Sequence, residues 1–181
     1  VGDKVAVIGM GMTAIDAATQ AKRLGAGEVT ILYRRTQAEM PCTEHELNIA
    51  QLDGCRIIWL AAPKEILGKN SKVSQLVCDV MHLGAPDKSG RRSPIASGET
   101  FTLDVDMVIK AAGQMPYEHL VDSYQINNHH GKIKVQDISL TNQKGVFAGG
   151  DCVNGGKEVV DAVQAGKEGA SAILAYLNDK V

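Results

Sequence analysis

Residues 4–35, KVAVIGMGMTAIDAATQAKRLGAGEVTILYRR, decide the fold of this chain. Residues 5–8 are apolar and largely β-branched, which predicts a short buried strand. A helix is predicted over residues 13–24, where a following glycine ends it, and a second strand over residues 28–33. This strand–helix–strand unit predicts an α/β fold built on a Rossmann-like, doubly wound parallel sheet.

The turn between the first strand and the helix has the sequence GMGMTA at residues 9–14, which is the G-x-G-x-x-A form of the dinucleotide fingerprint. Gly9 permits a tight turn, Gly11 lets a pyrophosphate approach the backbone, and Ala14 lets the helix pack close to the strand. The positive end of the helix would face the phosphates. The alternative is a glycine-rich turn that binds no ligand.

The end of the second strand indicates which dinucleotide binds. An NAD site usually carries Asp or Glu there, whereas this chain has Arg34 and Arg35. A guanidinium can bind the extra phosphate of NADP through charge-assisted hydrogen bonds, which predicts NADPH as the cofactor. The alternative for at least one of the two arginines is a solvated strand end.

Composition excludes several classes of partner. The chain has 181 residues, 44% of them hydrophobic, and a formal net charge of −2, which gives no electrostatic reason to expect nucleic acid or an anionic membrane. No apolar run approaches membrane-spanning length and no signal peptide is recognisable. The first residue is Val1, one step before a core strand, and we therefore expect a fragment of a longer protein.

The cysteines and histidines point to neither a redox pair nor a metal centre. No C-x-x-C motif is present, and spread cysteines of this kind are typical of a reducing cytoplasm. Each is interpreted as a small buried hydrophobic residue: Cys42, Cys55, Cys78 and Cys152. His129 and His130 lie in a stretch with the composition of a turn.

The chain continues the alternation and then departs from it. Thr43 and Glu46 form a predicted capping box for a helix that ends near residue 52, and a third strand is predicted over residues 56–60. Three further short strands, joined by polar turns, predict an antiparallel meander in place of a crossover helix, over residues 65–68, 73–83 and 100–103.

The segment of residues 84–98 is predicted to be an exposed hairpin tip, because it contains prolines, glycines and the basic run KSGRR at residues 88–92. A docking or nucleic-acid role is the alternative, although no aromatic residues interleave the basic ones. A buried strand is predicted next, over residues 106–113.

A second informative block lies near the C-terminus. Short strands are predicted over residues 133–135 and 145–148, and the latter leads into Gly149-Gly150-Asp151. A helix is predicted over residues 159–177. Glycines beside a carboxylate suit a hydroxyl-bearing chain bound close to the backbone, and a helix start can present N–H groups to an electron-rich ring. An ordinary strand-end turn is the alternative.

Three blocks of sequence together resemble the glutamate synthase small-subunit family and related FAD- and NAD(P)H-dependent oxidoreductases. They are KVAVIGMGMTAID followed by LYRRTQAEMP, AAGQMP at residues 111–116, and GVFAGGDCVNGGKEVVDAVQAGK, which begins at residue 145. The second block resembles the family's A-T-G-x-x-P crossover between domains, and the third resembles its second FAD motif. The resemblance covers almost the whole chain.

The resemblance implies an NADPH-binding Rossmann-like domain over residues 1–113 and the C-terminal part of an FAD-binding domain over residues 114–181. The implied NADPH pyrophosphate ligands are Gly9, Gly11, Met12 and Thr13, and Arg34 and Arg35 would hold the extra phosphate. The implied residues of the crossover and the flavin site are Gly113, Gly150, Asp151, Val159 and Val160. Asp151 would bond the ribityl or phosphate region, and the two valines would face the pyrimidine edge of the flavin.

The resemblance also implies the activity: hydride passes from NADPH to FAD, and electrons pass on through iron–sulfur clusters, most simply for glutamate biosynthesis together with a large glutamate synthase subunit. The first FAD fingerprint and the cluster-binding cysteines would lie upstream, outside this chain. FAD would therefore be bound only in the full-length parent, and the isolated chain is expected to be inactive. No side chain is expected to act as an acid or base.

Several alternatives are open on sequence alone. The parent could be of the dihydropyrimidine dehydrogenase or the ferredoxin:NADP oxidoreductase type, because the acceptor site lies outside the chain. A disulfide reductase with two dinucleotide sites is disfavoured by the missing C-x-x-C motif. A non-catalytic nucleotide-binding module is disfavoured by the block around Asp151, since a sensor has no use for a flavin half-site.

Overall fold

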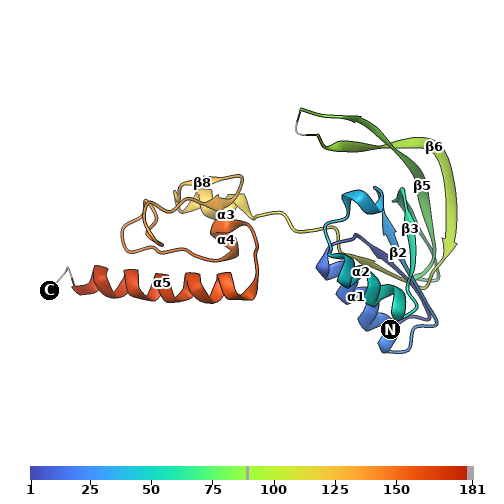
Figure 1. Ribbon diagram of the computed structural model, residues 1–181, viewed down its shortest axis with the longest axis horizontal. Coiled ribbons are helices and arrows are strands. Elements are labelled where there is room, and N and C mark those ends of the chain that lie inside the picture. Colours follow the sequence, from blue (N-terminus) through green and yellow to red (C-terminus); the bar gives the residue numbers. More distant parts are fainter. Residues whose placement is uncertain (89, 179–181) are drawn as a thin grey trace. The chain divides into compact units, whose positions relative to one another are not determined.

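The computed structural model describes residues 1–88 and 90–178 and divides into two compact units, Val1–Gly113 and Gln114–Val181 (Figure 1). Each unit has its own secondary structure and is described by itself.

The first unit contains a parallel sheet in the order β3-β2-β1-β7. Its strands are β1 (Lys4–Ile8), β2 (Glu28–Tyr33), β3 (Arg56–Trp59) and β7 (Met107–Lys110). The helices α1 (Met12–Arg23) and α2 (Glu44–Leu52) follow β1 and β2, and the short 3-10 helix η1 (Gln37–Glu39) precedes α2. All three strand pairs are parallel. The strand order and the alternation with helices confirm the predicted Rossmann-like class.

Two hydrophobic cores lie on opposite faces of this sheet, because side chains alternate along a strand. In β1, Val5 and Val7 belong to the core that includes buried residues of α1 and α2, whereas Ala6 belongs to the core on the other face. In β2, Ile31 and Leu32 divide in the same way. A strand buried on both faces must be apolar throughout, which is why the sequence of residues 5–8 shows no polar alternation.

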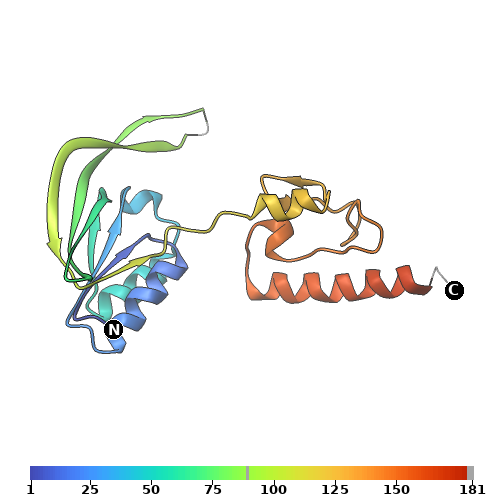
Figure 2. The same ribbon diagram turned by 180° about the vertical axis from the view of Figure 1, so that it is seen from behind.

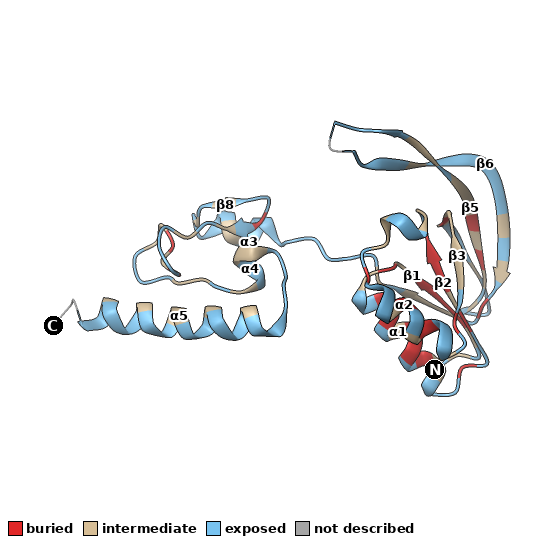
Figure 3. Cartoon of the chain, viewed as in Figure 1, coloured by how far each residue is buried: buried red, intermediate tan, exposed pale blue. Residues whose placement is uncertain are grey.

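The sequence predicted an antiparallel meander in place of a crossover helix, and the structure has this antiparallel sheet and places it over the second face of the parallel sheet (Figures 1 and 2). Its strands are β4 (Ala61–Lys69), β5 (Lys72–Pro86) and β6 (Arg92–Asp104). Buried Leu76 and Cys78 of β5 pack with Ala6 and Leu32 of the parallel sheet. Burial is concentrated in the parallel sheet and in the helices α1 and α2 that pack on it, and a smaller buried cluster lies where the two sheets meet (Figure 3).

The predicted exposed tip over residues 84–98 is too long. Strand pairing continues to Pro86 and resumes at Arg92, so the turn is confined to the residues between them, of which Ser89 lies outside the described residues. Gly84 and Pro94 were assigned to the tip because glycine and proline are usually excluded from strands. Here they lie where the register shifts, between Leu83 and Pro86, and such irregularities tolerate both residue types.

Local signals set the helix ends as predicted. Thr43 caps α2: its hydroxyl accepts the Glu46 N–H at 3.2 Å, and the Glu46 carboxylate accepts the Thr43 N–H at 2.7 Å. At the C-terminal end of α1, Gly25 adopts a φ of 103°, a left-handed conformation that ends the helix at low cost in free energy.

The described residues of the second unit, 114–178, form the two-stranded ribbon β8–β9 and three helices. The elements are α3 (Glu118–Ser123), β8 (Asn128–His129), β9 (Lys132–Ile133), α4 (Asp151–Asn154) and α5 (Val159–Asn178). His130 and Gly131, with φ values of 51° and 75°, form the turn between β8 and β9. The composition indicated neither α3 nor α4. Helix α5 agrees closely with the predicted helix.

The strand predicted over residues 145–148 is wrong. Gly145 has a φ of 79° and lies in a turn, and only Phe147 pairs, through an isolated bridge to Leu140. The apolar run Val146-Phe147-Ala148 suggested a strand, but within the described residues the pairing is limited to this one bridge. Hydrogen bonds flank it on both sides, from the Thr141 N–H to the Val146 carbonyl at 3.1 Å and from the Ala148 N–H to the Ser139 carbonyl at 2.8 Å.

Helix α5 is amphipathic by sequence but contains no buried residue; Val163, Ile173 and Leu174 are all exposed. None of the helices within the described residues is long and apolar enough to cross a membrane.

Candidate nucleotide-binding site

Gly9 lies immediately after β1, where the backbone of β7 comes very close. Its φ is 135°, and a Cβ atom there would lie 2.2 Å from the carbonyl oxygen of Ala111. The Gly9 N–H donates to the Leu32 carbonyl at 3.0 Å, and the Ala111 N–H donates to the Ile8 carbonyl at 2.8 Å. Glycine is therefore required by the approach of β7 as well as by the turn. The turn is predictable from the local sequence, whereas the close approach of β7 is not, because it joins residues about 100 positions apart.

The start of α1 presents hydrogen-bond donors to open space. Gly11 is the N-cap, with extended backbone, and a Cβ atom there would meet nothing within 4 Å. Its carbonyl accepts the Ala14 and Ile15 N–H groups at 2.9 and 3.1 Å. Within residues 1–88 and 90–178, the N–H groups of Met12 and Thr13 have no hydrogen-bond partner. With no acidic residue in the first turn, this helix end has the geometry and polarity that favour an anion.

Ala14 behaves as predicted. It is completely buried, and its Cβ lies 3.4 Å from the position that a Cβ of Gly9 would take. Alanines continue along the same face of α1, where Ala18 and Ala21 are also buried. Small side chains on this face keep the helix close to the sheet, so that the start of α1 is held firmly beside the end of β1.

Arg34 and Arg35 follow β2 and so lie at the same carboxyl edge of the sheet as the glycine turn. Arg34 is exposed, and no hydrogen-bond or ion-pair partner for its side chain is found in the described part of the chain. The backbone of Arg35 is fixed, because its carbonyl accepts the Leu60 N–H at 3.1 Å. Its side chain is held too: Nε donates to the Arg92 carbonyl at 3.2 Å.

An acidic residue, Glu39, follows these arginines but is engaged elsewhere. Its carboxylate accepts hydrogen bonds from the N–H and the hydroxyl of Thr36, the former at 3.1 Å. These bonds, chiefly that from the Thr36 hydroxyl, lower the pKa of the Glu39 carboxyl, and attraction to Arg92 contributes in the same direction. The carboxylate therefore organises the turn after β2 and does not form a salt bridge with Arg34 or Arg35.

Gly113 ends the first unit, with a φ of 93° and open space where a side chain would project. The geometry allows close approach of a ligand at this position. No side chain there contributes chemistry.

In the second unit, Gly149 and Gly150 directly precede α4, which begins at Asp151. Gly150 has a φ of 68°, and Gly149 lies close to α5, since a Cβ there would be 3.3 Å from that of Ala165. Asp151 is exposed as the first residue of α4.

Val159 and Val160 begin α5 and are 79% and 74% exposed. Exposed adjacent valines at a helix start offer an apolar edge and backbone N–H groups together.

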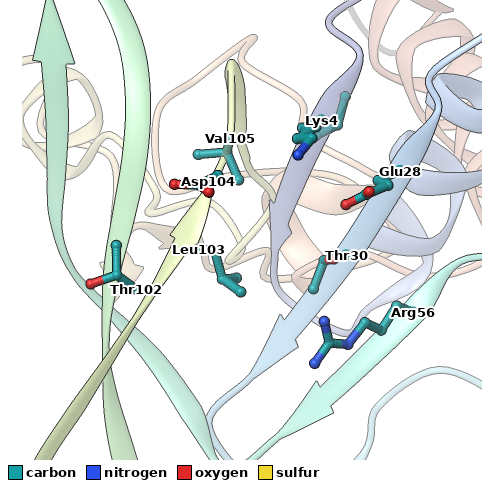
Figure 4. Close-up of a pocket in the computed structure, with 9 residues that line it drawn as sticks. Lys4, Glu28, Thr30, Arg56, Thr102, Leu103, Asp104 and Val105 are labelled. Carbon is teal, nitrogen blue, oxygen red and sulfur yellow. The ribbon is translucent and has the colours of Figure 1, made fainter.

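A surface hollow lies at the opposite edge of the parallel sheet (Figure 4). It is lined by the first residues of three strands, Lys4, Glu28 and Arg56, and by the end of β6, and its volume is about 170 Å³. Doubly wound sheets bind ligands at the carboxyl ends of their strands, and this hollow is at the amino ends. It is also smaller than a typical pocket of about 300 Å³ or more. It is not the candidate nucleotide site.

Within the described residues all four cysteines are free thiols. Cys42, Cys55 and Cys78 are buried, as interpreted from the sequence, but that interpretation is wrong for Cys152, which is exposed near the start of α4. Burial raises the pKa of the Cys42 and Cys55 thiols and raises that of Cys78 to about 11. A raised pKa keeps a thiol protonated and unreactive at neutral pH. In the same described ranges, no group of three or more potential metal ligands is found.

The parallel sheet, the glycine turn and the antiparallel layer define a Rossmann-like α/β protein. The chain belongs to the pyridine nucleotide-disulphide oxidoreductase family, whose match covers residues 1–166.

Named relatives cover nearly the whole chain. It is 39% identical over 178 residues to the NADP(+)-dependent formate dehydrogenase subunit beta of Moorella thermoacetica, covering 97% of this chain and 25% of that protein. It is 37% identical over 184 residues to the glutamate synthase [NADPH] small chain of Azospirillum brasilense, covering 99% of this chain and 38% of that protein. The chain thus spans well under half the length of these relatives.

Solved structures support the fold. Thioredoxin reductase from Lactococcus lactis matches with a TM-score of 0.80 at 24% identity, covering 97% of this chain and 53% of that one. FprA from Mycobacterium tuberculosis, solved in complex with NADPH, matches with a TM-score of 0.70 at 18% identity, covering 98% of this chain and 53% of that one.

Proposed function

We propose that this chain is the NADPH-binding part of a flavoprotein oxidoreductase of the glutamate synthase small-chain type. In this proposal NADPH binds at the carboxyl edge of the parallel sheet of the first unit. The second unit supplies the C-terminal part of an FAD site, which is completed by polypeptide outside these 181 residues.

The observation that carries the proposal is the coincidence of two anion-binding features at one sheet edge. The start of α1 offers the N–H groups of Met12 and Thr13, and the end of β2 offers the side chain of Arg34. The pyrophosphate and the 2′-phosphate of NADPH are separate anionic groups, and NADH lacks the second. A chain specific for NADH would more often have a carboxylate in place of the arginines.

The names of the relatives support NADPH as the cofactor more strongly than they support any one final electron acceptor. The names of both relatives described above contain NADP(+) or NADPH, whereas one is a formate dehydrogenase subunit and the other a glutamate synthase chain. A further relative, from Geobacter sulfurreducens, is named NADPH-Fe(3+) oxidoreductase subunit beta and is 34% identical over 204 residues. We favour the glutamate synthase type because several relatives carry that name.

Bound NADPH and FAD would supply the redox chemistry, namely hydride transfer from the nicotinamide C4 to the flavin N5. The residues of this chain bind and orient. Gly11 allows the pyrophosphate to approach the helix start, Arg34 and Arg35 bind the 2′-phosphate, and Asp151 accepts hydrogen bonds from flavin-chain hydroxyls. In the parent protein, electrons then pass to iron–sulfur clusters and an acceptor subunit.

Calorimetric titration with NADPH and NADH tests the NADPH site. Substituting Arg34→Ala and Arg35→Ala together should weaken NADPH binding by about tenfold or more, since a charge-assisted hydrogen bond contributes on the order of 1.5–3 kcal/mol. NADH binding should change little, because NADH has no 2′-phosphate. Equal losses for the two cofactors would contradict the proposed phosphate contact.

The flavin part of the proposal is tested with the isolated chain and the full-length parent. The isolated chain should bind NADPH, purify without bound flavin and fail to reduce dyes with NADPH even when FAD is added. The parent should contain flavin and oxidise NADPH. Stoichiometric flavin in the isolated chain would contradict the division of the FAD site, and a flavin-free parent that only binds NADPH would favour a non-catalytic nucleotide-binding module.

An acceptor screen with the parent separates the remaining alternatives. Glutamate formation with a large subunit supports the glutamate synthase type. Reduction of pyrimidines or of ferredoxin would instead indicate the dihydropyrimidine dehydrogenase or the ferredoxin:NADP oxidoreductase type.

A further inference from the structure

The β5–β6 hairpin brings a third arginine, Arg92, to the carboxyl end of β2, which Arg34 and Arg35 follow; we call this end of the sheet the arginine corner. Arg35 Nε donates to the carbonyl oxygen of Arg92 at 3.2 Å, although the two residues are 57 positions apart in sequence. The bond joins the end of β2 to the start of β6 within the first unit. Figures 1 and 2 both show the hairpin, in green, bending along its length so that its tip lies beyond the end of the parallel sheet.

The Arg92 side chain has most of its donors available. Its Nε donates to the Gly84 carbonyl at 3.0 Å, which orients the guanidinium, and the residue is exposed. Across the described residues its two terminal nitrogens have no partner. An arginine anchored at Nε with both terminal nitrogens available can bind two oxygens of one phosphate.

The hydrogen bond between Arg35 and the Arg92 carbonyl places Arg92 beside the turn after β2, which contains Glu39. Arg92 lies close enough to attract the Glu39 carboxylate and to contribute to its lowered pKa, behind the larger effect of Thr36. Because that carboxylate is already bonded to Thr36, it does not pair with Arg92. Arg34, Arg35 and Arg92 thus leave an excess of positive charge at the arginine corner, which a dianionic group would relieve.

We propose that Arg92 is a specificity-determining residue that binds the 2′-phosphate monoester of NADPH together with Arg34 and Arg35. The inference rests on the proposed NADPH site and extends it, because it assigns part of cofactor recognition to the antiparallel hairpin and not to the dinucleotide-binding βαβ unit. The hairpin is thereby a functional element as well as a cover for the sheet.

The geometry allows this role to be separated from a structural one. Arg35 contacts the main-chain carbonyl of residue 92, which every substitution retains, whereas the proposed phosphate contact needs the guanidinium. Arg92→Ala removes both the positive charge and the paired N–H donors of the guanidinium, whereas Arg92→Lys keeps the charge and removes the paired donors. Arg91→Ala is the matched control: Arg91 is the exposed neighbour, with the same charge, and its N–H donates to the Asp87 carboxylate at 3.0 Å.

The test is calorimetric titration of the 181-residue chain and these variants with NADPH, NADH and adenosine 2′-monophosphate. Arg92→Ala should weaken binding of NADPH and of adenosine 2′-monophosphate by about tenfold, and Arg92→Lys should weaken both less. NADH binding should change by less than about twofold in every variant, and Arg91→Ala should resemble the wild type. The difference in NADPH affinity between the wild type and Arg92→Ala should become smaller as the salt concentration is raised, because the proposed contact is exposed to solvent.

Different results would overturn the proposed NADPH site and the proposed role of Arg92. Wild-type chain that does not bind NADPH overturns the proposed function and this inference with it. If Arg34→Ala with Arg35→Ala weakens NADPH binding but Arg92→Ala and Arg92→Lys do not, the NADPH site stands and the role of Arg92 is wrong. If Arg92→Lys weakens the binding of NADPH and of NADH equally, the role of Arg92 is also wrong, because such a loss would come from a change in the structure of the hairpin. Thermal melts of each variant show whether the fold is intact.

Discussion

Gly9 and Gly11 belong to one fingerprint, yet substituting alanine at each should have opposite consequences. In Gly9→Ala the new Cβ would lie 2.2 Å from the Ala111 carbonyl oxygen, with a φ of 135°. Such a φ costs a non-glycine residue about 1–3 kcal/mol, and displacing the tightly packed backbone adds about 1–3 kcal/mol. The expected loss of about 2–6 kcal/mol is a large part of a typical stability of about 5–15 kcal/mol.

Gly11→Ala meets open space, with a φ of −83° that alanine adopts readily. Its cost is limited to a poorer N-cap, about 0.5–1 kcal/mol. Under the proposed function, however, the methyl group occupies the space into which the pyrophosphate approaches. We therefore expect near-normal stability and about tenfold or more weaker NADPH binding.

Trp59 provides the assay, because it is the only tryptophan and lies in β3 of the first unit, edge-on to Tyr33 with ring centroids 6.1 Å apart. Its fluorescence during heating and urea titration reports unfolding of the parallel sheet independently of the second unit. Gly9→Ala should lower the Tm by about 8–24 °C, at about 4 °C per kcal/mol for a unit of this size. A decrease below about 4 °C would refute the close-approach argument.

Two further predictions concern stability. Burial raises the pKa of the Cys78 thiol from the ordinary 9.0 to about 11 in the folded chain, so the folded chain retains a proton that the unfolded chain loses. The stabilisation from this proton is therefore complete below about pH 9. It is lost as the pH rises towards 11, by on the order of 2 kcal/mol. Urea unfolding of Cys78→Ala should show a shallower decline over this range than the wild type or Cys152→Ala, and parallel declines would exclude the effect. Thr43→Ala removes the N-cap of α2 and should cost about 1 kcal/mol, whereas Thr43→Ser should restore it; identical melting of the two variants would mean that the capping hydroxyl contributes nothing.

Local sequence signals predicted a large part of the fold because they act between near neighbours. The apolar run before Gly9, the capping pair Thr43 and Glu46, and the periodicity of residues 159–177 each specify an element without reference to the rest of the chain. The same reasoning failed for residues 145–148, where an apolar run looked like a strand. There, only Phe147 pairs, through a bridge to nearby Leu140, and no neighbouring strand in the described part of the chain continues the pairing to the other residues of the run.

The candidate site was predicted in part for the same reason. Gly11, Arg34 and Arg35 are recognisable by their spacing from the first two strands, which places them at one edge of any parallel sheet. The arrival of Arg92 at that edge was not recognisable. The basic run that contains it was noted, but its destination depends on the length and curvature of β5 and β6, and the predicted tip was too long.

By itself, the sequence determined the class of sheet, the polarity of its ligand edge and the kind of cofactor for which that edge is suited, since these depend on residue type at short spacing. Tertiary structure alone decided that β7 lies against Gly9, that the antiparallel sheet covers the second face, and that Arg35 meets Arg92. These contacts join residues far apart in the chain. Their formation depends on strand register and packing, which are properties of the whole folded unit and are encoded in no single stretch of it.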